Sequence, residues 1–135
     1  MKPTPLGVGQ VEELGRAWGR DLAPGSVVWL EGPLGAGKTT LARAMVQARG
    51  ITDGATSPTY ALVHHYQGSS GAVYHVDCYR LRTPDDAADL DWETLAAGEL
   101  LIIEWPERAG AWAPRPTVRI RLAHAEAETR LVEVA

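Results

Sequence analysis

The stretch that most constrains this chain is GPLGAGKTT at residues 32–40, which fits the phosphate-binding pattern G-x-x-x-x-G-K-[ST]. Gly32, Gly37, Lys38 and Thr39 occupy the fixed positions of that pattern. A β-rich run, SVVWLEG, leads into the stretch, and a helical pattern follows it. A glycine-rich turn between a strand and a helix predicts a P-loop, on which many nucleotide-binding α/β domains are built.

Each residue type in the loop has a chemical task. Gly35 and Gly37 let the backbone turn so that successive N–H groups point at phosphate oxygens, and the start of the helix adds partial positive charge. Lys38 supplies a mobile charge for the β- and γ-phosphates, and the Thr39 hydroxyl is a ligand for Mg²⁺. The alternative is an ordinary turn in which Thr39 and Thr40 cap the helix. Composition weighs against that alternative, since the chain has 2 lysines against 11 arginines.

The rest of the chain predicts an α/β fold of the P-loop NTPase type, with three layers and a mixed sheet whose parallel core carries antiparallel additions. Residues 1–135 are expected to form one domain, because this length supports a single core. An N-terminal helix is expected over residues 11–22, although Gly15 and Gly19 weaken its pattern. The other expected elements are a hairpin in which TYALVHHY and AVYHVDCY flank QGSSG, a helix in pieces from Pro84 to Gly98, a strand in ELLIIEW, and strands in TVRIRLA and TRLVEVA.

Composition limits the functional classes. Hydrophobic residues make up 45% and charged residues 22% of the chain, so it is expected to fold throughout. The formal net charge of -4 argues against a protein that binds nucleic acid by itself, and any link to RNA is expected to run through a partner. Cys78 is the only cysteine, which excludes an intramolecular disulfide. The lack of a signal-peptide pattern and of a membrane-length apolar run predicts a cytoplasmic protein with no membrane contact.

A metal ion on the nucleotide needs a second carboxylate, which P-loop proteins usually carry at the end of a neighbouring strand. Glu104 ends LLIIE and Asp77 ends AVYHVD, so both are candidates. A carboxylate at either place is partly desolvated and therefore costly unless a cation such as Mg²⁺ neutralises it. For Glu104 the plainer alternative is an ion pair with Arg108. For Asp77 it is a surface pair with Arg80 or Arg82.

Two further segments adjoin these candidates. In ATSPTYALV, residues 55–63, Ser57 and Pro58 are typical of a turn that enters a strand, and a hydroxyl-rich loop there is equally typical of a γ-phosphate switch. The residues alone do not decide between these interpretations. After Glu104, Pro106 removes a backbone donor and biases Trp105 toward an extended conformation, so the strand is expected to stop with that indole beside the site.

Four blocks together resemble the TsaE family, the small bacterial ATPases required for threonylcarbamoyladenosine modification of tRNA. The blocks are GPLGAGKTTLARAM, SPTYALV, HVDCYRL and LIIEWPE, and their order and spacing match from about residue 26 to residue 107. The P-loop is generic, whereas the other three blocks together are specific. The resemblance implies a P-loop α/β fold and slow hydrolysis of ATP with Mg²⁺. It also implies that the protein acts together with the TsaB and TsaD proteins and contacts tRNA only indirectly, through them. It also implies that Ser57 to Tyr60 form a mobile switch.

Carried over by position, the resemblance implies particular roles. Thr39 and Glu104 would ligate Mg²⁺, and Asp77 and Trp105 would be important for activity. The residues that would hold the phosphates of ATP are Gly35, Ala36, Gly37, Lys38, Thr39 and Thr40.

The predicted chemistry is hydrolysis by positioning and charge neutralisation, with Lys38, Asp77 and Glu104 as the catalytic residues. Asp77 is expected to orient the attacking water or the shell of the metal. A small-molecule or nucleoside kinase is the competing hypothesis, because Asp77 and Arg80 resemble the acid and arginine at a strand end of some kinases. Against it, 135 residues leave little room for an acceptor pocket and a lid. A third hypothesis is a nucleotide-gated assembly factor that barely hydrolyses ATP.

Overall fold

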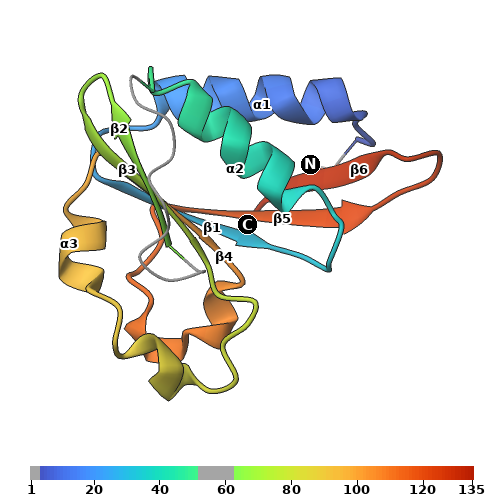
Figure 1. The fold of residues 1–135 in the computed structure, drawn as a ribbon. Helices are drawn as coiled ribbons and strands as arrows, with labels where there is room; N and C mark the ends of the chain where they lie inside the picture. Colours follow the sequence, from blue (N-terminus) through green and yellow to red (C-terminus); the bar gives the residue numbers. More distant parts are fainter. Residues whose placement is uncertain (1–3, 52–62) are drawn as a thin grey trace.

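The computed structural model describes residues 4–51 and 63–135. Its centre is a six-stranded sheet with the order β2-β3-β4-β1-β5-β6 (Figure 1). The strands are β1 (Ser26–Glu31), β2 (Val63–Gly68), β3 (Gly71–Asp77), β4 (Leu100–Glu104), β5 (Val118–His124) and β6 (Arg130–Val134). The α-helices are α1 (Val8–Asp21), α2 (Lys38–Gln47) and α3 (Trp92–Ala96), and short 3₁₀ helices span Pro84–Ala87, Pro106–Arg108 and Gly110–Trp112.

The sheet has a parallel core. The neighbouring strands β3, β4, β1 and β5 run parallel, and β2 and β6 pair antiparallel with them at the two edges. The hairpin of β2 and β3 and the antiparallel pair of β5 and β6 are both as expected, although residues 59–62 of the predicted hairpin lie outside the described residues. The predicted mixed sheet, with a parallel core and antiparallel additions, is confirmed.

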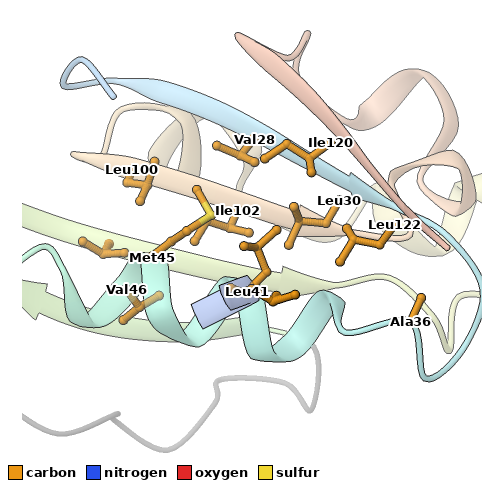
Figure 2. Close-up of a cluster of buried hydrophobic side chains, with 13 residues drawn as sticks. Val28, Leu30, Ala36, Leu41, Met45, Val46, Leu100, Ile102, Ile120 and Leu122 are labelled. Carbon is orange, nitrogen blue, oxygen red and sulfur yellow. The ribbon is translucent and has the colours of Figure 1, made fainter. Parts of the chain in front are cut away.

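Helices cover both faces of the sheet and make three layers. α1 and α2 pack together on one face, and α3 with the short 3₁₀ helices lies on the other (Figure 1). On the first face the core forms between α2 and the central strands, and Figure 2 shows the side chains of Leu30, Ile102 and Ile120 pointing toward Leu41 and Met45. Burial of this apolar surface is the main force that holds α2, and the loop before it, on the sheet.

β4 is buried on both faces, and its alternation positions the candidate carboxylate. Leu100 and Ile102 pack in the cluster under α2, whereas Leu101 and Ile103 pack in the cluster on the α3 side. Successive side chains of a strand point to opposite faces. Glu104 is therefore on the same face as Leu100 and Ile102, toward the start of α2.

Two of the three glycines inside α1, Gly15 and Gly19, fit that helix to α2. Both are buried in a helix that continues without a break. A Cβ on Gly15 would lie 2.8 Å from the Cβ of Ala44, and one on Gly19 would lie 2.4 Å from the carbonyl oxygen of Met45. Gly15 and Gly19 weaken the helical pattern of the sequence, but the expected helix is present. The close approach of the two helices outweighs the low helix propensity of glycine.

The remaining helices are short. The helix expected in pieces between β3 and β4 is present as Pro84–Ala87 and α3. Asp91 is the N-cap of α3, and its carboxylate accepts a hydrogen bond from the Thr94 N–H at 3.1 Å. The two 3₁₀ turns that follow β4 carry no signal in the hydrophobic pattern. Throughout residues 4–51 and 63–135, no helix is both long and apolar enough to cross a membrane.

Candidate functional site

The carboxyl ends of the parallel strands β1, β3 and β4 meet at one edge of the sheet, beside the start of α2. A pocket of about 290 Å³ opens there, and it contains Lys38, Thr39, Asp77, Glu104 and Trp105. The other lining residues are Val8, Val11, Leu34, Gly35, Gly37, Thr40, Tyr79 and Arg130. The structure thus brings the predicted catalytic and metal-binding residues into one pocket, at the place where open α/β sheets bind ligands.

The loop between β1 and α2 leaves the start of the helix open to an anion. Gly37, the N-cap of α2, is left-handed with φ 98°, and within the described part of the chain no side chain caps the helix. The alternative in which Thr39 and Thr40 cap the helix therefore does not match the structure. Gly32 lies so close to β5 that a Cβ there would be 2.1 Å from the Leu122 carbonyl oxygen. The first N–H groups of α2 are free of side-chain caps, as in anion-binding helix starts.

Of the two segments predicted to surround the phosphates, the structure describes the phosphate loop and not the predicted switch. Five of the six predicted phosphate-loop residues line the pocket. The sixth, Ala36, turns its methyl group into the core, and its N–H donates to the carbonyl oxygen of Pro33 at 3.2 Å. The predicted switch, Ser57 to Tyr60, lies outside the described residues.

Lys38 is folded back on its own loop. Only 4% of its surface is exposed, and its ammonium donates to the carbonyl oxygens of Gly32 and Pro33, the latter at 2.8 Å. The same ammonium lies 4.2 Å from the centre of the Trp105 ring. Burial lowers the pKa of Lys38, and nearby carboxylates, with Glu104 foremost, partly oppose that shift. A phosphate would offer this buried cation a better partner than two neutral carbonyl groups.

Glu104 is buried, with 3% of its surface exposed, and it is held by Thr39 and His75. The Thr39 hydroxyl donates to Glu104 Oε1 at 3.1 Å and lies 3.3 Å from Oε2. His75 Nε2 lies 2.5 Å from Oε2. Arg108 instead donates to the carbonyl oxygen of Tyr79 and stacks over the Tyr79 ring at 4.7 Å. The alternative of a Glu104–Arg108 ion pair therefore does not match the structure.

His75 is a buried residue beside Glu104 that the sequence did not single out. It is 5% exposed, and it lies on β3 opposite Ile102 of β4. A signal was present in AVYHVD, because the alternation of a strand puts His75 on the same face as Asp77. What the chain alone did not show is that β3 adjoins β4, which brings the imidazole to Glu104.

Asp77 ends β3 directly opposite Glu104 in the register of β3 and β4. Its Oδ1 accepts a hydrogen bond from the Tyr79 N–H at 2.9 Å, and the residue lines the pocket. Among the ion pairs between described residues, none joins Asp77 to Arg80 or Arg82. The carboxylate is therefore left facing the pocket with a backbone amide as its recorded hydrogen-bond donor.

Trp105 stops the strand beside the site, as expected, but not in the expected conformation. Its φ of 57° and ψ of 49° are left-handed, whereas Pro106 was expected to make it extended. Proline disfavours the right-handed helical region for the residue before it, and a left-handed turn is the other way to avoid that region. The turn lets the Trp105 N–H donate to the Leu30 carbonyl oxygen at 3.3 Å, and the ring lies close to both Lys38 and Arg108.

The outer part of the pocket was not predicted from the sequence. Val8 and Val11 of α1, Leu34 of the loop and Arg130 of β6 line it. Leu6 and Arg130 join the chain ends there by exchanging two backbone hydrogen bonds of 2.8 Å. No motif marks these residues, because they meet only through the tertiary pairing of the N-terminal segment with β6.

The oxygen donors at Thr39 and Glu104 suit Mg²⁺. A hydroxyl and a carboxylate are hard ligands, and these two lie 3.1 Å apart. Over residues 4–51 and 63–135, no group of three or more His, Cys, Asp and Glu side chains could hold a metal ion by itself. Mg²⁺ commonly takes one or two protein ligands and completes its shell with phosphate and water. The donor set therefore fits an ion that is bound together with a nucleotide.

A family model and individual relatives both show which protein family this chain is similar to. The family model for Threonylcarbamoyl adenosine biosynthesis protein TsaE matches residues 8–132. The tRNA threonylcarbamoyladenosine biosynthesis protein TsaE of Treponema pallidum is 39% identical over 109 residues, which cover 80% of this chain and 80% of that protein. The protein of the same name from Streptomyces coelicolor is 35% identical over 122 residues, covering 88% of this chain and 82% of the relative.

A solved structure is similar in fold. The crystal structure of Bacillus subtilis YdiB superposes with a TM-score of 0.76 and covers 96% of this chain and 81% of its own. The two sequences are 23% identical, so this likeness concerns the fold alone.

Proposed function

This chain belongs to the TsaE family, and from that premise we propose that it is a single-domain P-loop ATPase that supports threonylcarbamoyladenosine modification of tRNA. It would bind ATP with Mg²⁺ and hydrolyse it slowly to ADP and phosphate. TsaB and TsaD are the proposed partners, and the net charge of -4 supports contact with tRNA only through them. In this role the protein would act in the cytoplasm.

The contact between Thr39 and Glu104 is the observation that carries this proposal. The hydroxyl that opens α2 and the carboxylate that ends β4 are separated by 65 positions in the chain, and they lie 3.1 Å apart. A carboxylate with 3% exposure is costly to bury unless a cation or several donors offset its charge. Burial lowers the pKa of Lys38, and the charge of the nearby Glu104 partly opposes that shift, so the two side chains stabilise each other's charges. Mg²⁺ would add the larger compensation for Glu104.

Phosphate binding would be shared between backbone and side chain. The N–H groups at the start of α2 would donate to phosphate oxygens, as at other helix N-termini. Lys38 would exchange its bonds to the carbonyl groups of Gly32 and Pro33 for bonds to the β- and γ-phosphates. Thr39 and Glu104 would hold Mg²⁺. The ion, when bound, would neutralise part of the negative charge of the phosphates.

The remaining residues would organise the attack of water. Asp77, at the pocket and level with Glu104, would accept a hydrogen bond from the attacking water and orient it in line with the bond that breaks. Trp105 would shield Lys38 from solvent, which strengthens the interaction of its charge with phosphate. No covalent intermediate is required, because positioning and charge neutralisation account for phosphoryl transfer to water.

The apolar outer part of the pocket would hold the base. Val8 and Leu34 are exposed at 57% and 64%, and together with the buried Val11 they offer a hydrophobic surface to a flat aromatic ring. The Arg130 side chain lines the same region and would contact the base or the ribose. The base would then lie at the junction of α1 and the phosphate loop.

Measurement of ADP formation tests the proposal. Purified protein is supplied with ATP and Mg²⁺ under three conditions: alone, with candidate nucleoside acceptors, and with TsaB and TsaD. We expect slow ADP release by the protein alone and faster release with the two partners, without phosphate on any acceptor. Transfer of phosphate to an acceptor would overturn the ATPase in favour of a kinase, and undetectable hydrolysis in all three conditions would leave only a nucleotide-gated binding protein.

A further inference from the structure

We propose that His75 is a positioning residue that holds the carboxylate of Glu104 in the orientation that binds Mg²⁺. This inference rests on the proposed function, because it needs Glu104 to be a metal ligand. His75 and Glu104 are 5% and 3% exposed, and their side chains meet with 2.5 Å between Nε2 and Oε2. No sequence motif used above assigns this histidine a role.

The direction of the hydrogen bond follows from the chemistry of the pair. An ionised carboxylate only accepts hydrogen bonds, so His75 Nε2 must carry the proton and donate it toward Glu104 Oε2. A charge-assisted bond of this length is among the stronger ones in proteins. The imidazole therefore fixes one of the two carboxylate oxygens.

The two oxygens of Glu104 are consequently divided between two tasks. Oε2 is taken by His75, while Oε1 is the nearer oxygen to the Thr39 hydroxyl, at 3.1 Å. The free lone pairs of Oε1 would then face the space beside Thr39, where the second proposed ligand is. Metal-binding side chains are commonly oriented by such an outer hydrogen bond, and its loss typically lowers metal affinity by about 10- to 100-fold.

The sheet makes the position of His75 rigid. Its strand, β3, is hydrogen-bonded to β2 on one side and to β4 on the other. On β4, His75 is paired with Ile102, which lies two residues before Glu104. A glutamate side chain has three rotatable bonds, and without the imidazole its carboxylate would be free to sample other rotamers. A rigid donor on the neighbouring strand thus restricts a flexible ligand.

The neighbouring His64 provides a matched control. Its ring lies on β2 with its centre 5.8 Å from the centre of the His75 ring, and it is only partly buried. Within the described part of the chain, Glu104 is hydrogen-bonded to Thr39 and His75 and not to His64. Removal of His64 changes the same face of the sheet without removing the proposed positioning bond.

The test measures metal binding separately from nucleotide binding. Mn²⁺ serves as the probe, and its binding to the protein–ADP complex is followed by the loss of the free-ion EPR signal. ADP affinity in EDTA is measured by calorimetry. For His75→Ala we expect the half-saturating Mn²⁺ concentration to rise about 10- to 100-fold, with ADP affinity in EDTA within about twofold of wild type. His75→Gln, which keeps an N–H donor of similar reach, should recover most of the Mn²⁺ affinity, and His64→Ala should match wild type.

Several outcomes would overturn the inference. Unchanged Mn²⁺ binding in His75→Ala would overturn it. A loss of ADP affinity in EDTA as large as the loss of Mn²⁺ affinity would also overturn it, because it would indicate a merely structural residue. If His75→Ala does not fold, His75→Gln decides, since Mn²⁺ binding as weak as in Glu104→Gln would reject the hydrogen-bond account. Failure of the proposed function has a different signature. Wild type and Glu104→Gln would then both bind Mn²⁺ no more tightly than free ADP binds it, and the proposed role of His75 would be rejected together with the metal site.

Discussion

Trp105 covers the ammonium group of Lys38, which lies 4.2 Å from the centre of the indole ring. The guanidinium of Arg108 lies 5.0 Å from the centre of the same ring, and the Tyr79 ring packs against it with 5.1 Å between centres. Each cation over the ring contributes about 0.5–2 kcal/mol. The left-handed backbone of Trp105 costs about 1–3 kcal/mol. A strained residue that contacts Lys38 supports the proposal that the indole serves the site.

Trp105 should report nucleotide binding by its fluorescence. When Lys38 moves from the ring toward a phosphate, the environment of the indole changes. We expect ADP with Mg²⁺ to alter the emission of wild type, and Trp105→Phe to abolish most of that change. Trp112→Phe is the control, since Trp112 is 47% exposed and does not line the pocket. A full response in Trp105→Phe would show that another of the 5 tryptophans carries the signal.

Lys38→Ala should weaken nucleotide binding or hydrolysis by about 100- to 1,000-fold, because it removes the charge proposed to meet the β- and γ-phosphates. Calorimetric titration with ATP and measurement of ADP release test the two effects. Arg43→Ala on the exposed side of the same helix removes a positive charge outside the pocket and should change both by less than about twofold. Equal losses in the two variants would indicate that only the overall charge matters.

Gly19→Ala should destabilise the fold by about 1–3 kcal/mol, because the added Cβ would lie 2.4 Å from the Met45 carbonyl oxygen and would force α1 away from α2. Gly9→Ala, in the same helix, meets nothing within 4 Å and should stabilise the protein by up to about 1 kcal/mol through helix propensity. Urea unfolding measures both. Opposite signs at the two glycines are expected, and a Gly19→Ala protein as stable as wild type would contradict the packing described for α1.

Cys78 should make stability depend on pH in the alkaline range. Burial raises the pKa of its thiol from 9.0 to about 12. The unfolded chain therefore loses this proton at lower pH than the folded protein, so the contribution is fully present below pH 9 and is lost as pH rises toward 12. The free energy of unfolding of wild type minus that of Cys78→Ala should be constant up to about pH 8 and fall by about 1 kcal/mol by pH 10. A difference that stays constant to pH 10 in reducing buffer would contradict a buried, protonated thiol.

The spacing of residues along the chain was enough to predict most of the residues that meet in the central part of the pocket. GPLGAGKTT marks a strand, a loop and a helix, and the apolar runs LLIIE and AVYHVD end on the carboxylates Glu104 and Asp77. Parallel strands put these ends at one edge, which is why Thr39 and Glu104 could be expected to meet. These features are local, and each depends on few residues.

The parts that escaped prediction depend on contacts between distant segments. His75 matters because β3 adjoins β4, and the register of two strands is not visible in either one alone. Gly15 and Gly19 look unfavourable until α2 is placed against them. Pro106 leaves both an extended and a left-handed conformation open to Trp105. The structure adopts the left-handed one, in which Trp105 contacts Lys38 and Leu30.

The Mg²⁺ dependence of ADP release by Glu104→Gln, measured in the presence of TsaB and TsaD, tests the central claim most directly. The amide keeps the size of the side chain but removes the charge proposed to bind the metal. Glu107→Gln is the control, because Glu107 is an exposed carboxylate three positions along the chain. We predict that wild type and Glu107→Gln saturate with Mg²⁺ alike, while Glu104→Gln keeps its fold and turns over about 100-fold more slowly at any Mg²⁺ concentration. Wild-type turnover with an unchanged Mg²⁺ dependence in Glu104→Gln would contradict the account.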